Sequence, residues 1–166
     1  MNPRSFHENL DFFAALDEVP RSERAQRIKE VLRDTGLEEQ ADTLVMKFSS
    51  GMYQRLGIAR ALVKRPSVLL LDEPTRSLDA IAAADFRHFL KTEVLARKDT
   101  SLLFASHTMQ EIELLADRVA ILDEGKLLAF DTPTALRART LSSSLEEAFA
   151  RLTGRRLYSA GQATPE

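Results

Sequence analysis

The sequence has no cysteine among its 166 residues. The chain therefore has neither a disulfide framework nor a thiolate metal site, and its composition fits a reducing cytoplasm. No apolar run comes close to the roughly 18 residues that a membrane helix needs. The opening residues MNPRSFHENLDFF also lack the apolar core of a signal peptide. We therefore expect any work at a membrane to be done through a partner.

An excess of basic charge is missing too. The 23 lysines and arginines and the 25 acidic residues give a net charge of −2 and form no basic block. The sequence therefore carries no electrostatic footprint for nucleic acid or anionic lipid, and we expect no nucleic-acid partner. Hydrophobic residues make up 44% of the chain, which is enough for one globular domain with its own core.

Two amphipathic helices are predicted near the start of the chain, over residues 5–17 and 22–34. Gly36 follows the second helix in the usual place of a left-handed cap. A polar connector, EEQADTLVMKF, comes next. The apolar positions that predict the two helices recur at helical spacing, at Phe6, Leu10, Phe13, Leu16, Ala25, Ile28, Val31 and Leu32.

Strands and helices alternate from residue 50 onward. Ser50 is expected to cap a helix, and the VLLL run at residues 68–71 is expected to form a fully buried strand, because it is short, β-prone and unalternating. Asp79 is expected to cap a long helix, and the stretch SLLFASH to form a second buried strand. TMQEIELLA then predicts a short helix.

The later part of the chain predicts a hairpin over RVAILDEGKLLAF and a further helix that Thr132 and Pro133 open. The order strand, helix, strand, helix, strand implies a parallel sheet flanked by helices, which is an α/β fold.

Ligands of such sheets lie at the carboxyl ends of the strands. Asp72, Glu73 and His107 fall there. Where magnesium, a phosphate group and water meet, one carboxylate can hold the metal while a second orients and deprotonates the attacking water. The alternative is that Asp72 and Glu73 are the polar end of a strand entering a turn, which the dipeptide alone favours. Their surroundings change that balance.

The stretch FSSGMYQRLGIARAL places hydroxyl groups, Gly51 and exposed amides at a helix N-terminus. The helix dipole and unpaired N–H groups there favour an anion such as a phosphate. The alternative is plain N-capping by Ser50. Gly51 directly after the cap, with Gly57 further along, is more than capping requires.

The order of FSSGMYQRLGIARAL, VLLLDEP, TRSLDA and ASHTMQEIELLADRVAILDEGKLLAFDTP resembles the nucleotide-binding domain of ABC transporters, from its signature motif to its C-terminal end. The resemblance implies a partial P-loop NTPase (ABC ATPase) fold with an N-terminal helical subdomain. It divides the chain into a helical subdomain at residues 1–47, the C-terminal part of the ATPase core at residues 48–135, and a C-terminal helix and tail at residues 136–166.

The resemblance also implies roles for single residues. Ser49, Ser50 and Gly51 would be the signature residues that contact the γ-phosphate of an ATP bound mainly to an opposing subunit. Asp72 would be the Walker B aspartate near Mg²⁺, and Glu73 the catalytic base.

Two further residues gain roles in the same way. Ser77, Leu78 and Asp79 match the D-loop of the family. That loop crosses the dimer interface in the family. Capping of the following helix by Asp79 is an equal alternative that does not exclude this role. His107 matches the switch histidine, whose imidazole would bond the γ-phosphate, although a lone histidine after a strand is usually an ordinary polar end group.

The signature departs from the family's usual Leu-Ser-Gly-Gly-Gln at Phe48, Ser50 and Met52. Phe-Ser-Ser-Gly-Met resembles the variant of ABC-2-type exporters, and the closing stretch SSSLEEAFARLTGR resembles the closing helix of the same subgroup.

The phosphate loop GxxxxGK[ST], the Walker A motif, does not occur in the sequence, and the only Gly-Lys pair, Gly125-Lys126, lies in the predicted hairpin turn. In the family this loop holds the triphosphate and precedes the helical subdomain. We therefore expect the chain to match a truncated ATPase domain, and the chain alone neither to bind ATP tightly nor to hydrolyse it.

The resemblance implies an ATP-binding subunit of an exporter that couples ATP hydrolysis, with Mg²⁺, to transmembrane transport. Its partners would be a second ABC ATPase subunit in a head-to-tail dimer and a membrane-spanning permease subunit, which would hold it at the cytoplasmic face of the membrane. Three alternatives stay open: a non-catalytic module that completes or regulates a partner ATPase, an ABC-type ATPase outside transport, and a gene fragment with no function of its own.

Overall fold

A computed structural model describes residues 5–97 and 99–155 of the chain. The chain divides into two compact units, the first reaching Ser106 and the second beginning at His107. Within the described residues, no helix has the length and apolar character needed to cross a membrane.

The first unit begins with two helices, α1 over Phe6–Leu16 and α2 over Arg21–Asp34. A capping box starts α1, because the Ser5 hydroxyl accepts from the Glu8 N–H at 3.2 Å while the Glu8 carboxylate accepts from the Ser5 N–H at 2.8 Å. Both predicted helices are confirmed, but Leu16 is 65% exposed rather than in the core. The buried residues of the two helices are Phe6, Leu10, Ala14, Ile28, Val31 and Leu32.

Gly36 ends α2 as predicted, in the left-handed conformation with φ of 65°. The Leu37 N–H donates to the Leu32 carbonyl and the Gly36 N–H donates to the Arg33 carbonyl, each at 2.9 Å. These are the two bonds of a Schellman motif, which satisfies carbonyls that the last helical turn leaves free.

The connector contains two short 3₁₀ helices, Glu38–Gln40 and Val45–Lys47, before helix α3 over Ser50–Leu62. The prediction that Ser50 caps α3 is wrong by one residue. Ser49 has the extended backbone of a cap, and its hydroxyl accepts from the Met52 N–H at 3.3 Å. Either serine carries the right side chain, and the cap falls on the one whose backbone is still outside the helix.

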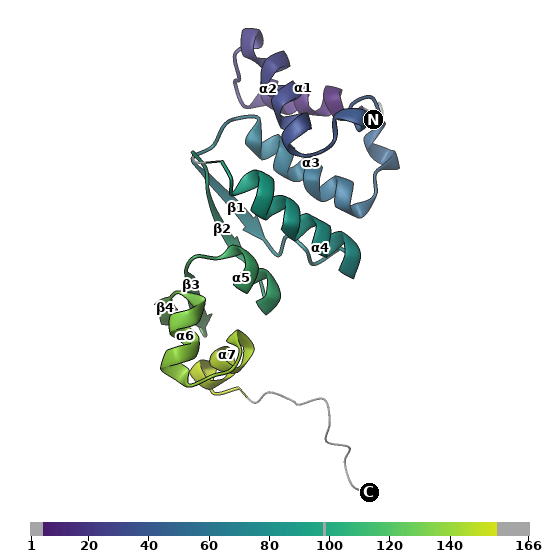
Figure 1. Cartoon of the computed structure of the whole chain (residues 1–166). Helices are drawn as coiled ribbons and strands as arrows, with labels where there is room; N and C mark the ends of the chain where they lie inside the picture. Colours follow the sequence, from purple (N-terminus) through teal and green to yellow (C-terminus); the bar gives the residue numbers. More distant parts are fainter. Residues whose placement is uncertain (1–4, 98, 156–166) are drawn as a thin grey trace, which may run out of the picture. The chain divides into compact units, whose positions relative to one another are not determined.

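The first unit also contains a parallel pair of strands, which lies beside helix α3 and helix α4 over Ala80–Phe89 (Figure 1). Strand β1 covers Val68–Asp72 and strand β2 covers Ser101–Ala105. Helix α4 and a π-helical turn over Leu90–Val94 connect them. The register places Val68 opposite Ser101 and Asp72 opposite Ala105, so both strands end at the same edge.

The two strands are covered on one face, not on both as the apolar runs predicted. Leu69 is 4% exposed, whereas Leu70 and Leu103, which lie opposite each other in the register, are 68% and 65% exposed. Side chains alternate between the two faces of a strand. The exposed apolar face is therefore the one that carries Val68, Leu70 and Leu103.

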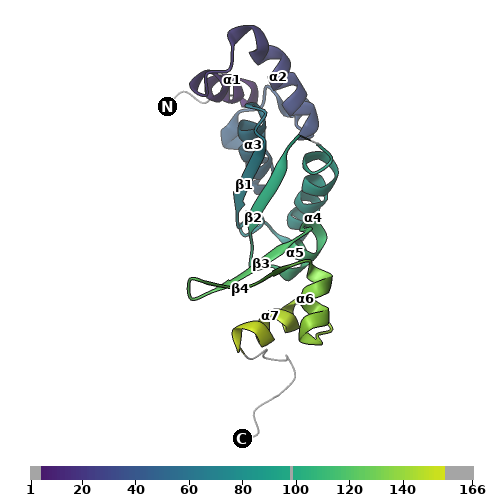
Figure 2. The same cartoon turned by 90° about the vertical axis from the view of Figure 1, so that its left-hand side faces the viewer.

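The second unit contains helix α5 over Met109–Leu115, a hairpin of β3 over Val119–Asp123 and β4 over Lys126–Asp131, and helices α6 over Pro133–Thr140 and α7 over Leu145–Thr153 (Figure 2). The predicted hairpin is confirmed, with Glu124 and Gly125 in left-handed conformations at its turn.

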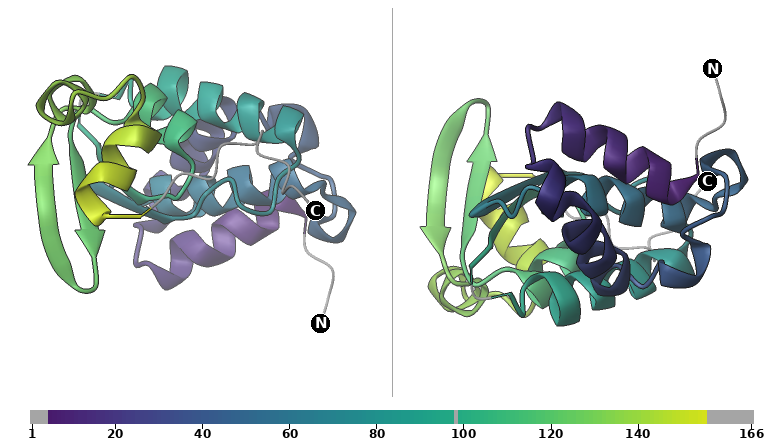
Figure 3. Two further views of the ribbon diagram at one scale, coloured as in Figure 1. Left: turned by 90° about the horizontal axis from the view of Figure 1, so that it is seen from below. Right: turned by 90° about the horizontal axis from the view of Figure 1, so that it is seen from above.

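The third strand of the predicted alternation does not extend the parallel sheet within the described residues. Strand β3 pairs antiparallel with β4 in a separate two-stranded sheet, because the tight turn between them returns the chain at once. Helix α7 lies along one side of this hairpin (Figure 3). The core of this unit, formed by the hairpin, α6 and α7, contains Val119, Ile121, Ala129, Leu136, Leu145 and Ala148.

Candidate functional site

The two predicted acids lie at the end of β1. Asp72 is the last residue of the strand and is exposed, while Glu73 follows it and is half-buried. The Glu73 N–H donates to the Ala105 carbonyl at 2.9 Å, which continues the pairing with β2 one residue past the strand. The sheet edge therefore fixes the backbone that carries both carboxylates.

Glu73 has a left-handed backbone, with φ of 45°. This conformation costs a residue with a Cβ about 1–2 kcal/mol relative to ordinary backbone. Such strain persists where the surroundings hold it, and it gathers at functional sites. The left-handed conformation turns the chain out of the sheet at Glu73, the predicted catalytic base.

The loop after Glu73 is held by short turns. The Arg76 N–H donates to the Glu73 carbonyl, and the Leu78 N–H donates to the Thr75 carbonyl, each at 3.1 Å. Pro74 and Thr75 are buried, whereas Ser77 is exposed. The start of the loop is therefore packed against the protein, while the side chain of Ser77 is exposed on its surface.

Asp79 caps α4, as one of the two interpretations predicted. Its Oδ1 accepts from the N–H groups of Ile81 and Ala82 at 3.0 and 2.9 Å. A contact of Asp79 with a dimer partner stays a prediction.

The predicted signature residues open α3. Ser49 caps the helix, and Ser50 and Gly51 are its first two residues. A Cβ built on Gly51 would lie 4.0 Å from the Cβ of Ala82 on α4, so the first turns of α3 and α4 are in contact. The signature residues therefore lie beside the start of the helix that follows the D-loop.

Gln54, which the sequence argument missed, links the same two segments. Its Nε2 donates to the Oγ of Ser77 at 3.1 Å. Gln54 lies one helical turn after Gly51 on α3 and so shares its face. That spacing was the signal in the sequence that could have identified it.

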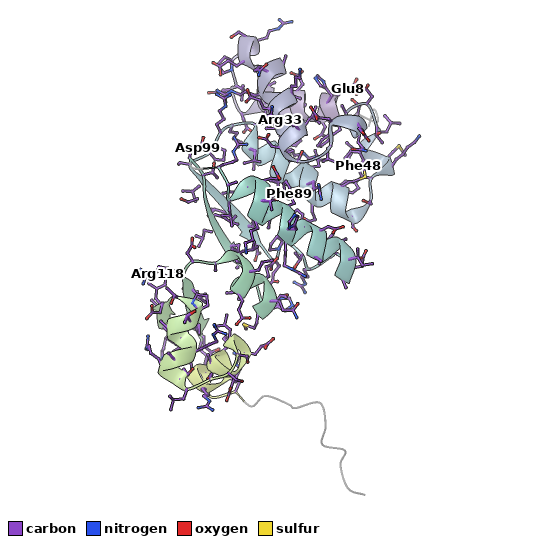
Figure 4. All side chains as sticks on the ribbon, in the orientation of Figure 1. Glu8, Arg33, Phe48, Phe89, Asp99 and Arg118 are labelled. Carbon is purple, nitrogen blue, oxygen red and sulfur yellow. The ribbon has the colours of Figure 1, made fainter. Side chains whose placement is uncertain are left out.

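Arg55 braces the signature helix from the neighbouring position. Its Nη1 donates to the Thr35 carbonyl at 3.0 Å, and its guanidinium lies over the ring of Phe89, 5.0 Å from the centroid. Phe89 lies on α4, and Phe48 lies just before α3 (Figure 4). Arg55 therefore ties α3 to the end of α2 and to α4.

Arg60 joins the other end of α3 to α1. Its Nε donates to Asn9 Oδ1 at 2.8 Å, and its guanidinium lies 4.4 Å from the centroid of the Phe13 ring. Burial lowers the pKa of Arg60. Phe13, predicted to lie on the apolar face of its helix, is thus partly covered by a cation.

His107 is exposed and begins the second unit, two residues after the end of β2. Its bond to a γ-phosphate stays a prediction, as do the roles of the other predicted site residues.

The described residues contain no group of three or more histidine, aspartate or glutamate side chains placed to hold a metal ion. Mg²⁺ is commonly held by one or two carboxylates together with phosphates and water. The exposed carboxylate of Asp72 fits a magnesium ion of that kind.

The chain is similar to known proteins in its sequence and in its structure. The family model described as "ABC transporter" matches residues 1–76. The linearmycin resistance ATP-binding protein LnrL of Bacillus subtilis is 37% identical over 134 residues, which cover 80% of this chain and 42% of that protein. The bacitracin transport ATP-binding protein BcrA of Bacillus licheniformis is 46% identical over 101 residues, 61% of this chain and 33% of that protein.

Among solved structures, cbiO1 from Clostridium perfringens, part of the ABC transporter complex cbiONQ, has a TM-score of 0.74 and 29% identity and covers 82% of this chain. The match covers 54% of that chain. The present chain spans less than half the length of curated relatives such as LnrL and BcrA. These likenesses agree with the parallel strands and helices described above, and the chain belongs to the family of ABC transporter ATP-binding domains.

Proposed function

We propose that this chain supplies one face of the ATP site in an ABC-type exporter, which couples ATP hydrolysis to transport across a membrane. The observation that carries the proposal is the contact between the first turn of α3 and the start of α4, reinforced by the Gln54–Ser77 hydrogen bond. It brings the signature residues and the D-loop onto one surface. The relatives named for linearmycin resistance and bacitracin transport support an exporter.

The signature face would act on an ATP held mainly by an opposing subunit. At the N-terminus of α3, the first backbone N–H groups lack partners within the helix and point along its positive end. Gly51 has no side chain to shield them, and the Ser50 hydroxyl adds a donor. Ser49, Ser50 and Gly51 would therefore surround the γ-phosphate as the two subunits close head to tail.

The strand-end acids would act on the nucleotide at this chain's own side. Asp72 would hold Mg²⁺, which offsets charge on the phosphates when bound. Glu73 would orient the attacking water and take its proton, and His107 would donate a hydrogen bond to the γ-phosphate. Asp79 would reach the partner across the interface while still capping α4.

The partners follow from this arrangement. A second ABC ATPase subunit completes the site, and a membrane-spanning permease subunit is moved by its closure. We propose that the chain works at the cytoplasmic face of the membrane through that permease. The division into residues 1–47, 48–135 and 136–166 remains part of this proposal.

A second candidate is a module that completes a partner ATPase without hydrolysing ATP itself. It is favoured by the lack of a GxxxxGK[ST] motif in the printed sequence. Calorimetric titration of the chain alone with Mg-ATP tests this second candidate. Affinity in the micromolar range would contradict the non-catalytic module.

The proposal is tested with a signature-disabled partner. This partner is a complete ABC ATP-binding protein that carries GxxxxGK[ST] but whose own signature serine and glycine have been replaced. Its homodimers hold ATP and lack a working signature face. We expect this chain to restore ATPase activity to the mixture, and G51D to abolish the restoration. No restored activity, with binding confirmed by ultracentrifugation, would contradict the proposal.

A further inference from the structure

We propose that Gln54 is a positioning residue that holds Ser77 of the D-loop in place and so couples the loop to the signature helix. The inference rests on the function proposed above and assigns a role within that site. Gln54 acts through Ser77, which it reaches from α3 with a hydrogen bond of 3.1 Å.

The hydrogen bonds next to Ser77 hold the backbone of the loop, whereas the hydrogen bond from Gln54 holds the Ser77 side chain. The backbone of the loop is fixed at Arg76 and Leu78 by the two turns described above. Asp79 is fixed by its bonds to the start of α4. These bonds set the path of the chain but do not set the direction of an exposed serine hydroxyl, which otherwise turns among three rotamers.

The geometry of α3 makes Gln54 suited to the task. It lies one turn beyond Gly51, on the face where α3 meets the start of α4. Its amide therefore spans from the signature helix to the loop without leaving the packed surface, and it is half-buried. A displacement of α3 is carried directly to Ser77.

The hydrogen bond from Gln54 also decides how the Ser77 hydroxyl can bond to another group. The amide N–H of Gln54 occupies a lone pair of Ser77 Oγ, so the hydroxyl hydrogen is left to donate elsewhere. A hydroxyl that accepts one hydrogen bond is a better donor of the next. Ser77 is thus presented as a directed donor on the surface that faces the opposing subunit.

The test uses the signature-disabled partner and measures the restored ATPase activity. We expect Q54A and S77A each to lower kcat about fivefold, the size expected for losing one hydrogen bond, and the double variant to lower it no further. The KM for ATP should stay unchanged, because the triphosphate is held by the partner. Q54E should be impaired like Q54A, since its carboxylate can bond the serine only by accepting from the hydroxyl and so uses the hydrogen that Gln54 leaves free.

G57A is the matched control. Gly57 lies on the same helix, is exposed, and has no atom within 4 Å of a Cβ built on it. It should leave kcat unchanged. Additive effects of Q54A and S77A, or a Q54E variant with full activity, would overturn the inference.

Hydrogen exchange on the chain alone separates this inference from the proposed function. In Q54A, the amides of residues 76–79 should exchange faster, while those of α1 and α2 stay unchanged. If the wild-type chain fails to restore activity, the proposed function fails, and exchange alone then decides whether Gln54 holds the loop. Unchanged exchange at residues 76–79 would refute the positioning role in either case.

Discussion

Gly51 on α3 and Ala82 on α4 lie so close that a Cβ added to the glycine would stand 4.0 Å from the alanine Cβ. This distance is an ordinary van der Waals contact and not a clash. The position is therefore open to alanine on packing grounds, and the absence of a side chain there has to be explained by something other than the core.

We predict that Gly51→Ala separates stability from activity. The free energy of unfolding should be unchanged or raised by up to about 1 kcal/mol, because alanine favours the helix more than glycine does. The restored ATPase activity should fall by about tenfold or more, since the new methyl group would shield the first amides of α3 from a phosphate.

Urea denaturation and the assay with the signature-disabled partner measure the two effects. G57A is the control, and it should show the gain in stability without the loss of activity. A G51A variant with full activity would contradict a phosphate contact at this turn.

A second prediction concerns the left-handed backbone of Glu73, with φ of 45°. Glu73→Gly should be more stable than Glu73→Ala by about 1 kcal/mol, because glycine adopts this conformation without the clash of a Cβ. Both variants lack the carboxylate and should be equally inactive in the complete site. Urea unfolding of the two variants checks the difference. Equal stabilities would show that the strain is relaxed in solution.

Much of the local structure was predictable because it rests on neighbouring residues. The left-handed cap at Gly36 and the hairpin turn at Gly125 are both short-range devices. Each satisfies backbone groups that lie within a few residues along the chain. The helices and strands were therefore found close to their observed bounds.

The burial of the strands was predicted less well. An apolar run such as VLLL indicates that both faces of a strand can be covered, but it does not say which element covers them. Leu69 is buried and Leu70 is not, and that difference depends on contacts far along the chain. Gln54 escaped notice for the same reason, since its partner Ser77 lies 23 residues away.

A third prediction concerns Leu141, which ends α6 in a left-handed conformation with φ of 52° and is 84% exposed. The Ser142 N–H donates to the Arg137 carbonyl, and the Leu141 N–H to the Ala138 carbonyl, so this is the same motif that Gly36 closes in α2. Leu141→Gly should raise the free energy of unfolding by about 1 kcal/mol.

Thermal and urea unfolding measure that gain. Leu141→Ala is the control, because it removes the exposed side chain and keeps the Cβ that causes the strain. Its stability should stay close to that of the wild type. A gain as large in the alanine variant would assign the effect to the exposed leucine side chain and not to the backbone.

The last prediction concerns pH. Hydrogen bonds from the Ser143 N–H, the Arg151 guanidinium and the Ser143 hydroxyl, at 2.8, 2.6 and 3.0 Å, hold the pKa of Glu147 below its ordinary value of 4.5. Because the folded pKa is depressed, the stabilisation is fully present above the unfolded pKa and is lost as the pH falls through the folded pKa. Glu147→Gln should therefore lower Tm slightly at neutral pH, and the difference should disappear in acid. Circular dichroism melts between neutral pH and about pH 3 follow this Tm difference.

Glu146→Gln removes the same charge from the neighbouring position of α7 and serves as the control. A Tm difference for Glu147→Gln that persists unchanged into acid would show that shape and not charge makes these bonds matter.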